Sequence, residues 1–213
     1  MLWLDNSTKD NASVHVKLPI ACGTDQQSQC VFRFNGDVFL HVFISSISDP
    51  VPKVDPGTIV IKESQTGGLG VFALRNIKRG ELLLAERPLV VCPMGFAADT
   101  RGWWAKMVTL ILNGRQADLS EQFKRIQAYE REMEMQKMFS KMTPENQRAY
   151  LSLANSHKED GTGPVSGILR TNGFEIGLPA SEKSDMTRYI AIGKVASRLN
   201  HRCELCLCMD FRG

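Results

Sequence analysis

Short β-branched and apolar runs alternate with glycine and proline in the middle of the chain. Such runs, four to six residues long and bounded by turn residues, are typical of strands. A glycine cluster at 67–70 and the turn Lys78-Arg79-Gly80 separate them. We predict a small β-meander whose strands cover 58–61, 71–74, 81–86 and 89–91.

The next part of the chain has apolar residues at helical spacing. Trp103, Trp104, Met107, Leu110 and Ile111 share one face of a helix that would end at Asn113-Gly114. A capping-box pattern, Asp118 with Glu121, predicts the start of a longer helix with Leu119, Phe123, Ile126 and several methionines on its apolar side. Those methionines indicate packing in a core or against a partner rather than a cofactor site.

Local signals also predict the elements that follow residue 142. Thr143 followed by Pro144 is typical of a helix start, because threonine caps the helix and proline fits its first position. We expect a loop over 155–166, a short element over 168–174, a loop over 177–187 and a strand over 189–192.

The first 56 residues have a different character. They carry a net charge of −2, against +5 for the remainder, and end in a proline-rich run at 48–57. Strand-like pieces at 30–34 and 38–44 leave open whether this leader is a tail or a hairpin. We divide the chain into a leader and linker at 1–56 and a domain at 57–213, with a helical segment over about 97–165.

Composition excludes several classes of protein. With 43% apolar and 23% charged residues and a net charge of +3, the chain resembles a globular protein, and no basic stripe of a nucleic-acid binder is present. The most apolar stretch, 38–47, is about half the length of a membrane span, and the N-terminus lacks the pattern of a signal peptide. Six cysteines are too few for a disulfide scaffold. We therefore expect an intracellular protein, nuclear or cytoplasmic, with no membrane and no nucleic-acid partner.

The glycine cluster is the first candidate for chemistry. Gly68, Gly70 and Ala73 formally match the dinucleotide-binding fingerprint, but strand and turn follow where that motif requires a helix. Two interpretations stay open: a loop whose backbone approaches a ligand, or a tight turn between two strands.

The second candidate lies at 198–208. Cys203, Cys206 and Cys208 with His201 suggest zinc, but this spacing is cramped for a tetrahedral site, and buried thiols in a strand are the simpler interpretation. We expect no zinc. The neighbouring Asn200 and His201 offer donors and acceptors suited to the polar edges of an amino-acid or nucleoside ligand.

In this order, these pieces resemble a SET domain, the fold of protein-lysine methyltransferases. Residues 67–89 are similar to the family's opening, Gly-x-Gly-hydrophobic-Phe-Ala, then x-Ile-x-x-Gly-Glu and an acidic-x-Pro, and 198–203 resemble its Asn-His-Ser-Cys motif. Residues 150–157 and 170–174 resemble the SMYD-like and fungal branch, which carries a helical insertion. The resemblance covers about residues 57–211 and implies an α+β fold of small β-sheets with a helical insert.

The resemblance also implies a cofactor, S-adenosylmethionine. Gly67, Gly68, Leu69 and Gly70 would contact it through the backbone, Asn200 and His201 would meet its amino-acid and adenine ends, and Asn172 would lie beside it. The partner would be a histone or another lysine-bearing protein. No catalytic residue and no metal ligand is assigned.

Several residues depart from the family motif, and these departures argue against methyltransferase activity. Arg202 stands where the family has serine, and Leu205-Cys206 replace Pro-Asn. The family's next segment, Gly-Glu-Glu-Leu-Thr-x-x-Tyr, has no counterpart before Gly213, so we expect a C-terminally truncated copy with weak or no activity. The alternative is a non-catalytic SET-like module that binds a protein through the helical insert and the leader.

Overall fold

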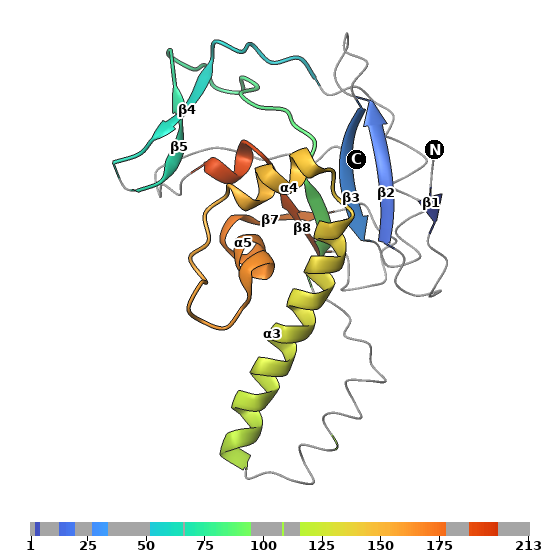
Figure 1. Ribbon diagram of the computed structural model, residues 1–213. Helices are drawn as coiled ribbons and strands as arrows, with labels where there is room; N and C mark the ends of the chain where they lie inside the picture. The colour runs from blue at the N-terminus through green and yellow to red at the C-terminus, as the bar shows by residue number, and fades with distance from the viewer. Residues whose placement is uncertain are drawn as a thin grey trace.

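The chain has a mixed α+β architecture with two small sheets and three described helices. The computed structural model describes residues 3–4, 13–19, 27–33, 52–65, 67–94, 108, 116–177 and 188–199. Figure 1 shows the helices on one side of the larger sheet, with the smaller sheet standing apart from it.

Six strands form the larger sheet in the order β1-β2-β3-β6-β8-β7. The strands are β1 (Trp3–Leu4), β2 (Ser13–Pro19), β3 (Gln27–Arg33), β6 (Val90–Pro93), β7 (Phe174–Gly177) and β8 (Arg188–Ile192). All neighbours are antiparallel except β3 and β6, which run parallel. The predicted strands at 30–34 and 189–192 are confirmed as parts of β3 and β8.

The smaller sheet is the hairpin of β4 (Ile59–Glu63) and β5 (Leu69–Ala73). It confirms the first two strands of the predicted meander, and β6 confirms the strand at 89–91, but the predicted strand at 81–86 and the meander pairing are wrong. Residues 81–88 form no strand, and β6 pairs with β3 and β8 rather than with the hairpin. Both edges of β6 are therefore occupied, and Pro88 has no amide hydrogen for a ladder.

Three helices follow β6 in the chain: α3 (Gln116–Ser140), α4 (Pro144–Leu151) and α5 (Pro164–Asn172). The predicted start of α4 is confirmed, because Thr143 Oγ1 accepts a hydrogen bond from the amide of Asn146 at 3.2 Å. The predicted cap at Asp118 is wrong, since α3 already includes Gln116. The loop after α4 ends at Gly163, three residues earlier than predicted.

Helix α5 takes its N-terminal cap from α3. The Glu132 carboxylate accepts hydrogen bonds from the amides of Val165 (3.2 Å) and Ser166 (2.8 Å). Gly163, which precedes the helix with φ of 91°, lies so close that a Cβ there would be 2.6 Å from the Glu132 carboxyl. The cap and the glycine therefore depend on each other, and together they fix α5 against α3.

The core lies between the helices and strands β6 and β8. Its members are apolar and at most 6% exposed: Leu89, Val90, Cys92, Met135, Met138, Met142, Tyr150, Leu153, Val165, Ile168, Leu169 and Ile192. Three methionines of the helical segment are thus buried, whereas Met133 faces solvent. Burial raises the pKa of Tyr150, whose hydroxyl donates to the Val165 carbonyl at 2.9 Å.

Some predictions fall outside the described residues. The helix around Trp103 lies there except for Val108, which is helical, as do the strand at 38–44 and the loop at 177–187 except for Gly177 at its start. The division into a leader at 1–56 and a domain at 57–213 stays a prediction.

Candidate functional site

The glycine cluster forms the turn of the β4–β5 hairpin. Ser64 donates its amide to the Gly68 carbonyl at 2.8 Å, and the Gly67 amide donates to the Ser64 carbonyl at 3.0 Å. Gly67 (φ 106°) and Gly68 (φ 65°) both adopt a conformation that favours glycine. The predicted tight turn is therefore present. A Cβ at either glycine would meet nothing within 4 Å, so open space also adjoins this backbone.

The other two residues of the cluster belong to β5. Gly70 is buried and pairs with Lys62, whereas Leu69 is 43% exposed and pairs with Glu63. Strand β5 lies beside a short 3₁₀ helix, η1 (Ala196–Arg198), with Cα atoms of the two elements within 8 Å of each other. Figure 1 shows η1 between the hairpin and the helices.

A carboxylate far away in sequence holds the start of η1. Glu86 Oε1 accepts from the amides of Val195 (3.1 Å) and Ala196 (2.6 Å), and its Oε2 also accepts from Val195 at 2.9 Å. Gly193 passes so close to this carboxylate that an added Cβ would overlap it. Glu86 is the acidic residue of the acidic-x-Pro motif, but the sequence does not indicate that it binds this segment.

Two further contacts fix η1 to the helices. Ser197 Oγ donates to the backbone carbonyl of Asn172 at 3.2 Å, and the Arg198 guanidinium donates to Ser152 Oγ at 2.9 Å. The segment that ends at Leu199 is thus held by the loop before β6, by α5 and by the end of α4. Asn200 and His201 follow directly in sequence and lie outside the described residues, as do the three cysteines at 203–208.

The side chain of Asn172 stabilises the end of α5 through hydrogen bonds. Its side-chain NH₂ donates to the carbonyls of Ala154 and Ile168, both at 2.7 Å, which uses both of its hydrogens. Its amide oxygen accepts no hydrogen bond from the residues that the structure describes. Toward a ligand, the side chain would therefore act as an acceptor.

A charged cluster supports the base of the hairpin. Arg75 donates to Thr58 Oγ1 at 3.0 Å and forms an ion pair with Glu81, whose second oxygen accepts from the Lys78 amide at 3.0 Å. These hydrogen bonds, the one from Arg75 first, lower the pKa of Glu81 to about 2. The Glu81 carboxylate in turn raises the pKa of Arg75. The turn at 78–81 and the hairpin are joined by this pair.

The structure brings some predicted site residues together and leaves others unplaced. The glycine hairpin and Asn172 share η1 as a neighbour, whereas the positions of Asn200 and His201 are not described. Within the described ranges, no group of three or more His, Cys, Asp or Glu side chains could hold a metal ion. No helix in the same ranges is long and apolar enough to cross a membrane.

Comparisons of the chain with protein-family models, with curated proteins and with solved structures return no match.

Proposed function

We propose that the chain is a SET-family protein that binds S-adenosylmethionine between the β4–β5 hairpin and η1, and that its chemistry is methyl transfer to a protein lysine. The observation that carries this proposal is the position of η1. This segment, directly upstream of Asn200 and His201, lies beside the glycine hairpin and is hydrogen-bonded to Asn172. Three separate stretches that the resemblance assigns to one cofactor thus have a common neighbour.

The described residues fit the chemistry of that cofactor. Open space adjoins the backbone at Gly67 and Gly68, where a side chain would obstruct a ligand. The Asn172 amide oxygen suits the cofactor's ammonium group, since an oxygen acceptor pairs well with a charged donor. When bound, S-adenosylmethionine would supply a methyl group on a sulfonium: a neutral lysine amine would attack the methyl carbon in line, the C–S bond would break with the thioether as leaving group, and the methylated amine would carry the positive charge.

The chain's own contribution to such a reaction is positioning. Glu86, Ser197 and Arg198 hold η1 through backbone and side-chain hydrogen bonds, so that the segment entering Asn200 starts from a fixed place. Positioning of two reactants in a site that excludes water accounts for much of the acceleration of such displacements. A lysine in such a site would lose its proton more readily, because burial disfavours the charged amine.

Calorimetric titration with S-adenosylmethionine tests this proposal. We expect micromolar binding to the chain, weakened at least tenfold in Gly68→Ala. Gly80→Ala is the matched control, because Gly80 also has a positive φ (79°), is exposed and has open space around it, but lies in the turn at 78–81. Both substitutions strain the backbone by about 1 kcal/mol, and only the first places a methyl group at the proposed site.

Two results would contradict the proposal. The first is no binding by the wild-type chain at millimolar cofactor, and the second is equal binding by Gly68→Ala and Gly80→Ala. Transfer of a radiolabelled methyl group to core histones then distinguishes an enzyme from a protein that only binds the cofactor.

A second candidate function is a non-catalytic interaction module. It is favoured by α3, on which Tyr129 is 63% and Met133 40% exposed although both are large apolar side chains. Exposed residues of this kind are enriched in protein interfaces.

A further inference from the structure

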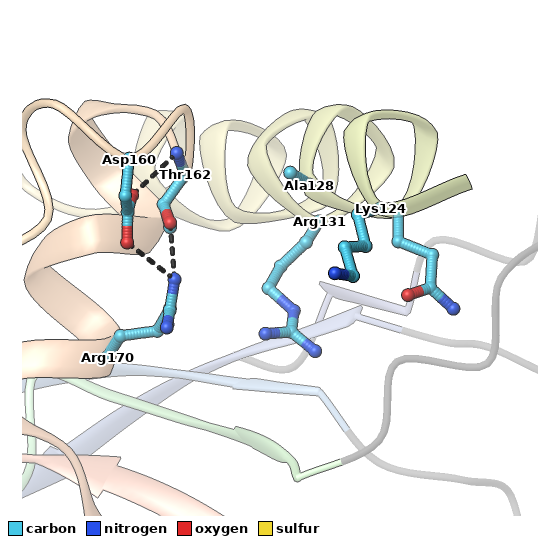
Figure 2. A pocket seen from close by; sticks show the side chains of 7 residues that line it. Lys124, Ala128, Arg131, Asp160, Thr162 and Arg170 are labelled. Carbon is cyan, nitrogen blue, oxygen red and sulfur yellow. Dashed lines mark hydrogen bonds and ion pairs between the residues drawn. The ribbon is translucent and has the colours of Figure 1, made fainter. Parts of the chain in front are cut away.

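A solvent-open cavity of about 350 Å³ lies between α3 and α5, on the helical part of the molecule. Lys124, Gln127 and Arg131 line it from α3, and Asp160, Thr162 and Arg170 line it from the turn before α5 and from α5 itself. Figure 2 shows the side chains of Lys124 and Arg131 extending from α3 on the side that faces Arg170.

The charges around this cavity are only partly balanced. Arg170 donates to Asp160 Oδ2 at 3.1 Å and to Thr162 Oγ1. Hydrogen bonds from Thr162 and His157 hold the pKa of Asp160 below its usual range, so its carboxylate stays charged and offsets Arg170. Lys124 and Arg131 form no ion pair with any residue that the structure describes. Among the described residues, two positive charges at the cavity therefore have no ion-pair partner.

The spacing of these two cations limits the ligand. They are seven residues apart on one helix, which corresponds to about 10 Å along its axis. At this spacing each cation can pair with an anionic group of its own. A peptide in the polyproline II conformation advances about 3.1 Å per residue with three residues per turn, so acidic side chains three residues apart lie on one side of it and would reach both. Gln127 lies one helical turn from each cation and can hydrogen-bond a peptide backbone between them.

We propose that this cavity binds an acidic peptide segment of a partner protein, with carboxylates paired to Lys124 and Arg131. The proposal specifies the partner chemistry of the interaction module and does not depend on cofactor binding or methyl transfer. A nucleic acid fits less well, because no aromatic side chain among the described lining residues offers a stacking surface for its bases.

Fluorescence anisotropy with a labelled oligoglutamate peptide tests the proposal in the absence of S-adenosylmethionine. We expect binding that weakens with added salt, and a dissociation constant about tenfold higher for the double variant Lys124→Gln/Arg131→Gln. The matched control is Arg125→Gln/Lys137→Gln, which removes the same two residue types from the same helix. Arg125 and Lys137 lie outside the cavity and pair with Glu121 and Glu134. The control should bind like the wild-type chain.

Four other outcomes of these measurements would contradict the proposal. Equal weakening in both double variants would mean a general effect of net charge, and no binding by the wild-type chain would remove the site. A labelled single-stranded oligonucleotide that binds through the same two cations, where the peptide does not, would assign the cavity to nucleic acid. A labelled oligoglutamine peptide that binds as tightly as oligoglutamate would remove the role of charge. All these results leave the cofactor titration unaffected, so the two proposals fail separately.

Discussion

Replacing Glu86 by glutamine perturbs the attachment of η1 with little change in shape. In the wild-type chain, the two carboxylate oxygens accept three hydrogen bonds from the amides of Val195 and Ala196, over distances of 2.6 to 3.1 Å. Glutamine has one acceptor oxygen, and its NH₂ group would face an amide hydrogen where the second oxygen had been. The variant therefore loses the negative charge, and its side-chain NH₂ group faces the amide hydrogen of Val195.

The magnitude follows from the number of donors affected. A hydrogen bond to a charged group contributes about 1.5–3 kcal/mol and a neutral one about 1 kcal/mol, so each of the two amides loses roughly 1 kcal/mol. Because one glutamine oxygen in the place of Oε1 can still accept from both amides, the further cost comes from the NH₂ group that faces the Val195 amide, and it is about 1 kcal/mol. We expect Glu86→Gln to lower the free energy of unfolding by about 2–3 kcal/mol.

Urea denaturation measures the global effect, and amide hydrogen exchange measures the local one. With a denaturant slope of about 2 kcal/mol/M, the midpoint should fall by roughly 1 M. The amides of Val195 and Ala196 should lose protection more than those of the core strands. Glu134→Gln is the control, because Glu134 is also partly buried and pairs with the exposed side chain of Lys137; its effect should stay below about 0.5 kcal/mol.

The reasoning would be refuted by a Glu86→Gln variant with the wild-type midpoint and unchanged exchange at the two amides. Such a result would mean that η1 keeps its place through its other contacts.

Three further changes have defined outcomes. Gly193→Ala should destabilise the wild-type chain by about 2 kcal/mol or more but a Glu86→Ala background by much less, because the added methyl overlaps the carboxylate; additive effects in urea denaturation would contradict this. Glu132→Ala should lower the free energy of unfolding by about 2–4 kcal/mol, since two buried amides of α5 lose their acceptor, and an unchanged urea midpoint would contradict it. The pKa of Glu81 is lowered from 4.5 to about 2 by Arg75, so its stabilising effect is complete above pH 4.5 and is lost as the pH falls toward 2. Urea midpoints of the wild-type chain and Glu81→Gln should converge over that range, and a constant difference would contradict the assignment.

Features that depend on residues close together in the sequence could be predicted. The cap of α4 needs only Thr143 and Pro144, and the hairpin needs glycines at the two positions with positive φ. The apolar strand at 189–192 is likewise a local pattern. In each case the physical cause lies within a few residues, so the pattern and the structure agree.

The predictions that failed depend on contacts between residues far apart in the sequence. Residues 81–86 have the composition of a strand, but both edges of β6 are taken by strands far away in the sequence, one by β3 and the other by β8. Glu132 caps a helix 33 residues away, and Glu86 binds amides 109 and 110 residues away. No local rule pairs such groups. For the candidate site, the glycine turn was predictable, whereas the attachment of η1 was not.

The last turn of α5 connects the two proposed binding places. Arg170 faces the cavity on α3, and Asn172, two residues later, bonds to η1 through its backbone carbonyl. Residues two apart on a helix point to nearly opposite sides, so one turn would present a cation to the proposed peptide site and an acceptor to the proposed cofactor site. If an acidic peptide displaces Asp160 from Arg170 and thereby shifts this turn, it changes the affinity for S-adenosylmethionine. Thermodynamic linkage then requires the cofactor to change the affinity for the peptide by the same factor. Equal affinities for S-adenosylmethionine with and without saturating peptide would mean that the two proposed sites are not coupled.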